Sequence, residues 1–238
     1  MKFSSHKQLT FFLSLVFILS ISIFQCKPEE KNDDSALLLL LGAGAITTGA
    51  GGTTTETKLR VFVTAASFDG NLGGVNGADT KCAADANKPS TGTYKAFITG
   101  NSGANGVRYA CLNDVTNCPT NPGAGTKNWV LQASTSYYRV DQSTKVFTTS
   151  ALGLIGTVHT SIQVSAASYW TGFVTTVTDW SATPGAAVCD LSATTAWTDN
   201  QGTNSGAVGD AASAALASIK ALNTQNCGST KKLLCVEQ

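Results

Sequence analysis

The sequence predicts an α+β domain of many short strands and two helices, held together by three disulfides. From about residue 58 onward, short segments rich in β-branched and aromatic residues alternate with Gly-, Asn- and Ser-rich turns, as is typical of strands joined by turns. Two stretches, which begin near Asn76 and Asp210, have apolar residues at helical spacing. Six of the seven cysteines lie beyond a segment typical of export, and an even number in an exported chain favours disulfides.

The N-terminal segment has the layout of an export signal. Lys2 and Lys7 precede an apolar run, 11–24, and no acidic residue occurs before Glu29. The run has 14 residues, whereas a membrane-spanning helix needs roughly 20, so cleavage is expected rather than permanent insertion. The segment ISIFQC resembles the lipobox of bacterial lipoproteins, in which the cysteine, here Cys26, becomes the lipid-carrying first residue. An ordinary signal peptide cleaved nearby is the alternative.

The segment that follows predicts a tether. A charged spacer, 27–34, precedes five leucines, 37–41, and a Gly- and Thr-rich remainder of the kind that forms flexible linkers. Five leucines are too few to span a bilayer; either they belong to a disordered tether or they enter the lipid surface and reinforce the anchor. The predicted organisation is therefore a signal peptide (1–25), a lipidated tether (26–57) and a folded domain (58–238).

The elements of the domain are predicted in order from its first apolar segment. Residues 59–65 (LRVFVTA) predict a strand, and the turn-rich FDGNLGG follows. Asn76 is placed to cap the first helix, with Asp79 three residues later as in a capping box, and Cys82 lies one turn after Ala78. Beyond it the sequence predicts strands at 93–99, 129–132, 137–140, 145–149 and 168–173, a loop over 100–127, a helix from Asp210 through Leu222 and a last strand within 231–238.

Composition argues against several classes of function. Loss of Lys2 and Lys7 with the signal leaves 14 of the 16 basic residues against 15 acidic ones, a net charge of −1. A nucleic-acid partner is not expected, because such proteins carry a basic stripe. The mature chain keeps one histidine, His159, and has no CxxC pair, so we expect neither a metal site nor a cofactor. No Ser/His/Asp order with supporting motifs is present, so an enzyme is not expected.

Both ends of the domain resemble endostatin, the C-terminal module of collagens XV and XVIII. The first end is carried by GGVNGADTKCAADA (73–86) and GTYKAFI (92–98), and the second by CDLSATTAWTDNQGTNSGAVGD (189–210) and NCGSTKKLLCVE (226–237). With the middle motifs SYWTG and DWSATPGAAVC, the chain is similar to the leptospiral endostatin-like (Len) lipoproteins, which share the DUF1554 domain. The resemblance covers about 59–238 and implies a C-type-lectin-like form of the α+β fold.

The resemblance also implies a disulfide pattern. Sequence alone does not choose among the possible pairings of six cysteines. The implied pairs are Cys82 with Cys235 and Cys189 with Cys227, which leaves Cys111 and Cys118 to pair with each other.

The same resemblance implies a function. The Len family is associated with surface display on the outer membrane and with binding of host laminin, fibronectin, plasminogen and complement factor H. The candidate contacts are Trp180, which is set among polar residues, and Lys231 and Lys232 beside the last strand. A structural envelope lipoprotein with its domain on the periplasmic side is the alternative, and the oligomeric state stays open.

A sugar-binding lectin is the second alternative. Trp197, Thr198 and Asp199 resemble the Trp-Asn-Asp motif of calcium-dependent lectins. Those lectins also need a Glu-Pro-Asn or Gln-Pro-Asp loop to bind calcium and sugar. The nearby Pro184 has no carboxylate or amide neighbour, which counts against this alternative.

Overall fold

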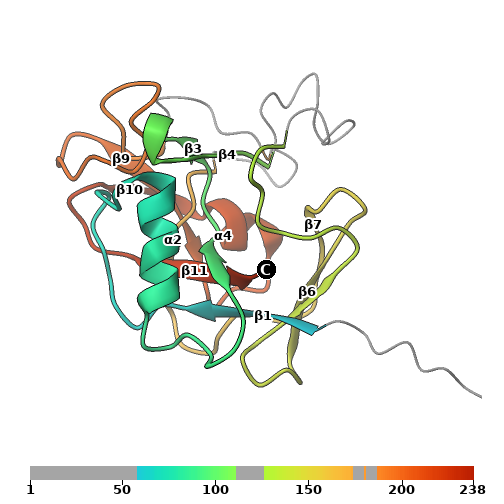
Figure 1. Cartoon of the computed structure of the whole chain (residues 1–238). Helices are drawn as coiled ribbons and strands as arrows, with labels where there is room; N and C mark the ends of the chain where they lie inside the picture. Colours follow the sequence, from blue (N-terminus) through green and yellow to red (C-terminus); the bar gives the residue numbers. More distant parts are fainter. Residues whose placement is uncertain (1–57, 111–125, 174–179, 181–186) are drawn as a thin grey trace, which may run out of the picture. The chain divides into compact units, whose positions relative to one another are not determined.

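The computed structural model describes residues 58–110, 126–173, 180 and 187–238, all within the second of the chain's two units, Thr54–Gln238. None of the helices in these ranges is long and apolar enough to cross a bilayer. Figure 1 shows helix α2 lying across the direction of strands β1 and β11. In chain order the elements are β1 (Lys58–Val63), α2 (Gly74–Ala84), β2 (Tyr94–Ala96), β3 (Gly100–Asn101), the 3-10 turn η1 (Gly103–Asn105), β4 (Val107–Arg108), β5 (Ser136–Tyr138), β6 (Lys145–Thr149), β7 (Ile155–Val158), β8 (Ser168–Trp170), β9 (Ser205–Asp210), α4 (Leu216–Ala221), β10 (Asn223–Asn226) and β11 (Lys232–Glu237).

The main sheet has nine strands and is mixed. Its order is β10-β9-β8-β11-β1-β5-β6-β7, and β2 also pairs with β11. The strands that lie far apart in sequence, β1 and β11, are neighbours at its centre and run antiparallel, with Val61 opposite Val236. β5 joins β1 in parallel, and β8 joins β11 in parallel. Strands β3 and β4 form a separate two-stranded sheet.

The prediction of an α+β, C-type-lectin-like fold is wrong. Of the described residues, 33% are in strands and 13% in helices, so the structure is mostly β. The second helix was expected to start at Asp210, but Asp210 is the last residue of strand β9. The helix found there, α4, is shorter and begins only at Leu216. Strands β9 and β10 take residues for which the sequence predicted no strand, and they pair with each other along one edge of the sheet.

Strand β9 was missed because its sequence, SGAVGD, consists mostly of small residues rather than β-branched ones. Packing explains this composition. A Cβ at Gly206 would lie 2.8 Å from the Trp170 ring, and one at Gly209 would lie 2.7 Å from the Tyr169 ring. The aromatic side chains of β8 thus occupy the space that side chains on β9 would fill.

The other predicted elements are confirmed in part. Strands are present within 59–65, 93–99, 137–140, 145–149, 168–173 and 231–238. Residues 129–132 form no strand, although Val130 and Leu131 are buried. The first helix is present but is not capped by Asn76: its N-cap is Gly73 in a left-handed conformation, without a side-chain cap.

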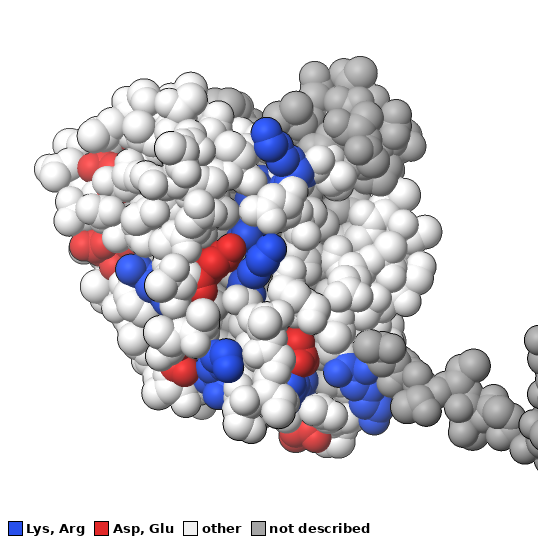
Figure 2. Space-filling model, viewed as in Figure 1, with Lys and Arg blue, Asp and Glu red and all other residues white. Residues whose placement is uncertain are grey.

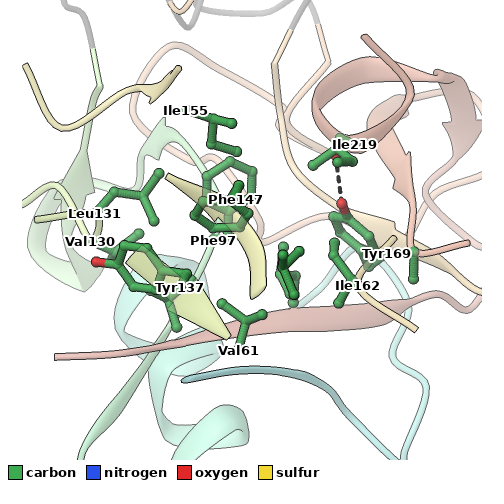
Figure 3. Packing of buried hydrophobic residues seen from close by; sticks show 14 of the residues in the cluster. Val61, Phe97, Val130, Leu131, Tyr137, Phe147, Ile155, Ile162, Tyr169 and Ile219 are labelled. Atoms are coloured by element: carbon green, nitrogen blue, oxygen red, sulfur yellow. Dashed lines mark hydrogen bonds between the residues drawn. The ribbon is translucent and has the colours of Figure 1, made fainter. Parts of the chain in front are cut away.

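The two central strands bury both of their faces, because successive side chains of a strand point to opposite sides. On one side lies what we call the aromatic core (Figure 3). It includes Val61, Val63, Phe97, Tyr137, Phe147, Ile162, Tyr169, Phe173, Trp180, Ile219, Leu234 and Val236. On the other side lies what we call the cystine core, which includes Phe62, Val75, Ala78, Cys82, Tyr94, Trp170, Cys189, Trp197, Cys227, Leu233 and Cys235.

The described disulfides both lie in the cystine core. Cys82 of α2 is bonded to Cys235 of β11 with their Cα atoms 5.7 Å apart, and Cys189 is bonded to Cys227 with their Cα atoms 5.6 Å apart. These are the pairings that the resemblance implied. All four side chains are fully buried. Cys111, Cys118 and the lipidation candidate Cys26 lie outside the described residues.

Two ion pairs, one buried and one partly buried, tie distant segments together. Arg60 on β1 donates to Glu237 on β11, with Nε 2.8 Å from Oε2 and Nη2 2.5 Å from Oε1. The hydrogen bond to Glu237 raises the pKa of Arg60 above its usual value. Arg108, which is fully buried, donates from Nη1 and Nη2 to the carboxylate of Asp79 on α2 at 2.9 and 2.7 Å. Asp79 therefore anchors the helix through its side rather than capping its end.

Candidate functional site

Trp180 was predicted to lie on the surface, but it is buried. It is 3% exposed, and its ring lies 5.4 Å from Phe173 and 6.2 Å from Trp129, measured between centroids. The Nζ atom of Lys220 lies 4.8 Å from the centre of the Trp180 ring. The polar sequence around Trp180 suggested exposure, but its ring fills part of the aromatic core. It therefore has no free surface with which to anchor a partner.

The two lysines of the last segment have different surroundings. Lys232 directs its Nζ to the backbone carbonyls of Thr64 and Ala65 at 2.7 and 2.6 Å, so its amine is engaged within the fold. The backbone of Lys231 pairs with Phe68, and its side chain is half-exposed. Of the two, only Lys231 keeps its amine as a candidate contact for a partner.

The residues that resemble a lectin motif are engaged within the structure. Trp197 is fully buried and donates from Nε1 to the carbonyl of Thr99 at 2.9 Å. Asp199 is 3% exposed, and its carboxylate accepts from the backbone N–H of Gln201 at 3.0 Å and from Asn204 Nδ2 at 2.6 Å. Among the residues described, no group of three or more His, Cys, Asp or Glu side chains is arranged to hold a metal ion.

A groove opens where strand β5 separates from strand β1. β5 pairs only with the first half of β1, Lys58–Arg60, whereas β1 continues to Val63. The space beyond that pairing is a cavity of about 280 Å³, lined by Val61–Val63 of β1, Asn87, Arg139–Val140 and Ile162–Val164. We call it the β1 groove. The register shift between Tyr137 and Tyr138 in the β5–β6 pairing precedes the point at which the chain leaves the strand.

The floor and the rim of the β1 groove differ in exposure. Val61, Val63 and Ile162, on the floor, belong to the aromatic core and are 1%, 4% and 3% exposed. Val140 and Val164, on the rim, are 50% and 84% exposed. Such exposure of large apolar side chains beside a recess is typical of a contact surface when the side chains are grouped.

Two polar side chains complete the lining. Arg139 donates from Nε and Nη2 to the carbonyl of Ser161 at 3.1 and 2.7 Å and from Nη2 to Ser161 Oγ at 3.0 Å. These bonds fix the guanidinium and leave its Nη1 group out of any hydrogen bond with the described residues. Within those residues no carboxylate lies within 4.0 Å of Arg139, since the ion pairs found there are those of Arg60 and Arg108. Asn87 donates from Nδ2 to the carbonyl of Val63 at 2.9 Å.

The acidic residues near these segments are engaged by backbone donors. Asp141, two residues after Arg139, accepts from Thr144 N, Thr144 Oγ1 and Ser143 N, and these bonds lower the pKa of its carboxyl to about 2. Asp85 accepts from the N–H groups of Ala65 and Ala66 and from that of Asn87. Neither carboxylate forms an ion pair with Arg139.

A second recess lies beside the C-terminal end of α2. It has a volume of about 310 Å³ and is lined mainly by alanines, with Phe68, Lys81 and Asp85. Lys81 Nζ lies 5.2 Å from the centre of the Phe68 ring, and Asp85 is occupied as described above. Since its charged groups have internal partners, this recess offers less to a ligand than the β1 groove.

The family follows from a comparison of the whole chain with known families. The model of DUF1554, a protein of unknown function, matches residues 65–214, more than half of the 238 residues. The chain belongs to the DUF1554 family. No curated protein matches it. The DUF1554 match includes Cys82, Cys189 and the segments 139–140 and 162–164 of the β1 groove, whereas the groove's floor on β1 precedes it.

The residues of the β1 groove were not predicted from the sequence. Arg139 and Val140 fell at the end of a predicted strand, and nothing in SIQVSAAS (161–168) marks Val164 as exposed. The groove arises from where β5 stops pairing with β1, which is a property of the tertiary structure. The unusual feature, a valine (Val164) with 84% of its surface exposed, is visible only in the structure.

Proposed function

We propose that this DUF1554 protein is a lipid-anchored surface protein that binds host extracellular-matrix and plasma proteins and is not an enzyme. The observation that supports this best is the β1 groove, with two exposed valines and a positive charge that has no described carboxylate partner. Apolar surface beside a fixed guanidinium suits a protein partner, since arginine is enriched where interfaces are most strongly bound.

The anchor and the location are part of the same proposal. Cys26 carries the lipid, and the tether 26–57 holds the folded unit at the surface of the outer membrane. Within the DUF1554 family, we assign the chain to the leptospiral endostatin-like lipoproteins on the sequence blocks 73–86 and 189–210. This assignment names laminin, fibronectin, plasminogen and complement factor H as the ligands to test.

The proposal is tested with the mature lipoprotein in detergent, oxidised and without added calcium. We expect saturable binding to at least one of the four host proteins, above that of an unrelated lipoprotein with the same anchor. Val164→Asp should reduce this binding, because it places a charge on the apolar rim of the groove while leaving the core untouched. Absence of binding to all four would favour a structural envelope lipoprotein.

The location needs a separate measurement. Protease treatment of intact cells should remove the folded unit if the protein is displayed on the surface, and leave it intact if it faces the periplasm. Cys26→Ala should release the protein from the membrane fraction, because a 14-residue apolar run is too short to span the bilayer.

A further inference from the structure

We infer that the β1 groove binds an extended segment of a partner protein in which an apolar side chain is flanked by a carboxylate. The inference rests on the proposed function and names the chemistry of the ligand at that site. It is drawn from four properties of the groove: its size, its apolar lining, the environment of Arg139 and its position beside Val61–Val63 of β1.

The size of the groove fits one side chain rather than a larger ligand. Its volume of about 280 Å³ lies just below the range of roughly 300–1,000 Å³ for pockets that enclose drug-sized molecules. The floor offers Val61, Val63 and Ile162, and the rim offers the exposed Val140 and Val164. An aliphatic side chain that enters between them removes apolar surface of both partners from water, which is favourable.

The positive charge of Arg139 determines which group of the ligand is favoured next to its apolar side chain. Arg139 is held by Ser161 through Nε and Nη2, so its Nη1 group keeps its donors for a ligand. A guanidinium pairs best with a planar anion such as a carboxylate. Asp141 and Asp85, the acidic groups on adjoining segments, accept backbone N–H donors and do not pair with Arg139.

The geometry also favours an extended segment over a helix. The groove runs beside Val61–Val63, the part of β1 that has no described strand on the side away from β11. A ligand there lies next to a strand, and apolar and charged side chains on neighbouring residues of an extended chain point to different sides. One reaches the floor while the next reaches the guanidinium of Arg139.

The test uses a fluorescein-labelled peptide, Gly-Glu-Val-Leu-Glu-Gly-Gly, and anisotropy measured with the oxidised mature lipoprotein in detergent. We expect Arg139→Gln to weaken binding by about 10-fold, as for the loss of a hydrogen bond between charged groups. Val164→Glu should weaken binding by about 5-fold, because it removes apolar surface and repels the carboxylates of the peptide. Val164→Lys removes the same apolar surface without the repulsion and should weaken binding less. Lys127→Gln removes an exposed positive charge outside the groove and should leave the Kd unchanged.

A matched peptide with glutamine in place of both glutamates separates charge from shape. It should bind the wild-type protein about 10-fold more weakly than the acidic peptide, and Arg139→Gln should no longer distinguish the two. Val164 is 84% exposed, so its variants keep the test valid even if Arg139→Gln disturbs the fold, which melting temperatures will show.

Several results would overturn the inference. These are no binding of the acidic peptide, equal binding of a peptide with lysines in place of the glutamates, or equal affinity for isovalerate alone, which would indicate a small-molecule site. Host-protein binding that survives both Arg139→Gln and Val164→Glu would remove the groove from the proposed function but leave that function intact. If the protein binds the peptide but none of the host proteins, the groove binds such a segment and the proposed function is wrong.

Discussion

The two sides of the central strand pair are stabilised in different ways. The cystine core contains both described disulfides, which join α2 to β11 and residue 189 to residue 227. The aromatic core contains none of these bonds; it depends on packed rings, including Phe173 and Trp180, and on a buried lysine, Lys220, beside them. The β1 groove takes its floor, Val61, Val63 and Ile162, from the aromatic core. The proposed binding surface is thus built on the side without a described covalent link.

The largest expected effect on stability comes from removing the disulfides of the cystine core. In Cys82→Ala/Cys235→Ala, loss of the link across 153 residues should lower the free energy of unfolding by about 5 kcal/mol on the chain-entropy model. The Cys189–Cys227 bond closes a shorter loop of 38 residues, so Cys189→Ala/Cys227→Ala should cost about 4 kcal/mol. Urea unfolding of oxidised protein measures both. Equal or reversed losses would mean that native packing, rather than loop length, sets the contribution.

The next effect tests the aromatic side. Trp180→Ala should lower the free energy of unfolding by about 3–5 kcal/mol, since it empties a large buried site and uncovers Lys220. Trp180→Phe keeps a ring at that position and should cost less. If urea midpoints show that Trp180→Ala is harmless, the ring does not belong to a cooperative core.

The buried tyrosines make both sides sensitive to alkali. Burial raises the pKa of Tyr137, in the aromatic core, and that of Tyr94, in the cystine core, to about 12, and it raises the pKa of Tyr169 well above its usual value. An unfolded tyrosine loses its proton near 10, so stability should be intact below about pH 10 and fall as pH rises toward 12. Two of the three tyrosines lie in the aromatic core. Tyr137→Phe removes one of these hydroxyls and should flatten the fall in melting temperature more than the control variant Lys127→Gln. A flat profile above pH 10 would contradict the burial of these hydroxyls.

The smallest expected effect separates the groove from the fold. Val164→Glu should change the free energy of unfolding by less than about 0.5 kcal/mol, because 84% of the side chain is exposed. The same variant is expected to weaken ligand binding. A large loss of stability in urea would show that Val164 supports the aromatic core and would make binding data on this variant uninterpretable.

Much of the fold was predictable where local pattern and tertiary structure agree. The segments LRVFVTA and KVFTT have β-branched or aromatic residues and became strands β1 and β6. Strand β9 was missed because its glycines accommodate rings from β8, so the reason for its composition lies on another strand. Asp79 matched a capping pattern, but its buried partner Arg108, 29 residues away, determined its role.

The candidate site was less predictable than the fold. Sequence patterns pointed to Trp180 and Lys232, and the structure engages both internally. Arg139 and Val164 were missed because a side chain's availability depends on what the rest of the chain leaves beside it. Local sequence reports residue type well, but it does not report which charges already have partners.

The placement of β1 beside β11 has a consequence for the order of folding. A polypeptide is synthesised from its N-terminus, so β1 is made long before its partner strand β11. Cys82 likewise precedes its partner Cys235 by 153 residues. Contacts between such distant segments form slowly, because the loop between them must first be closed. The pairing at the middle of the sheet is therefore completed only after β11 has been made, and the chain cannot close around its own centre before then.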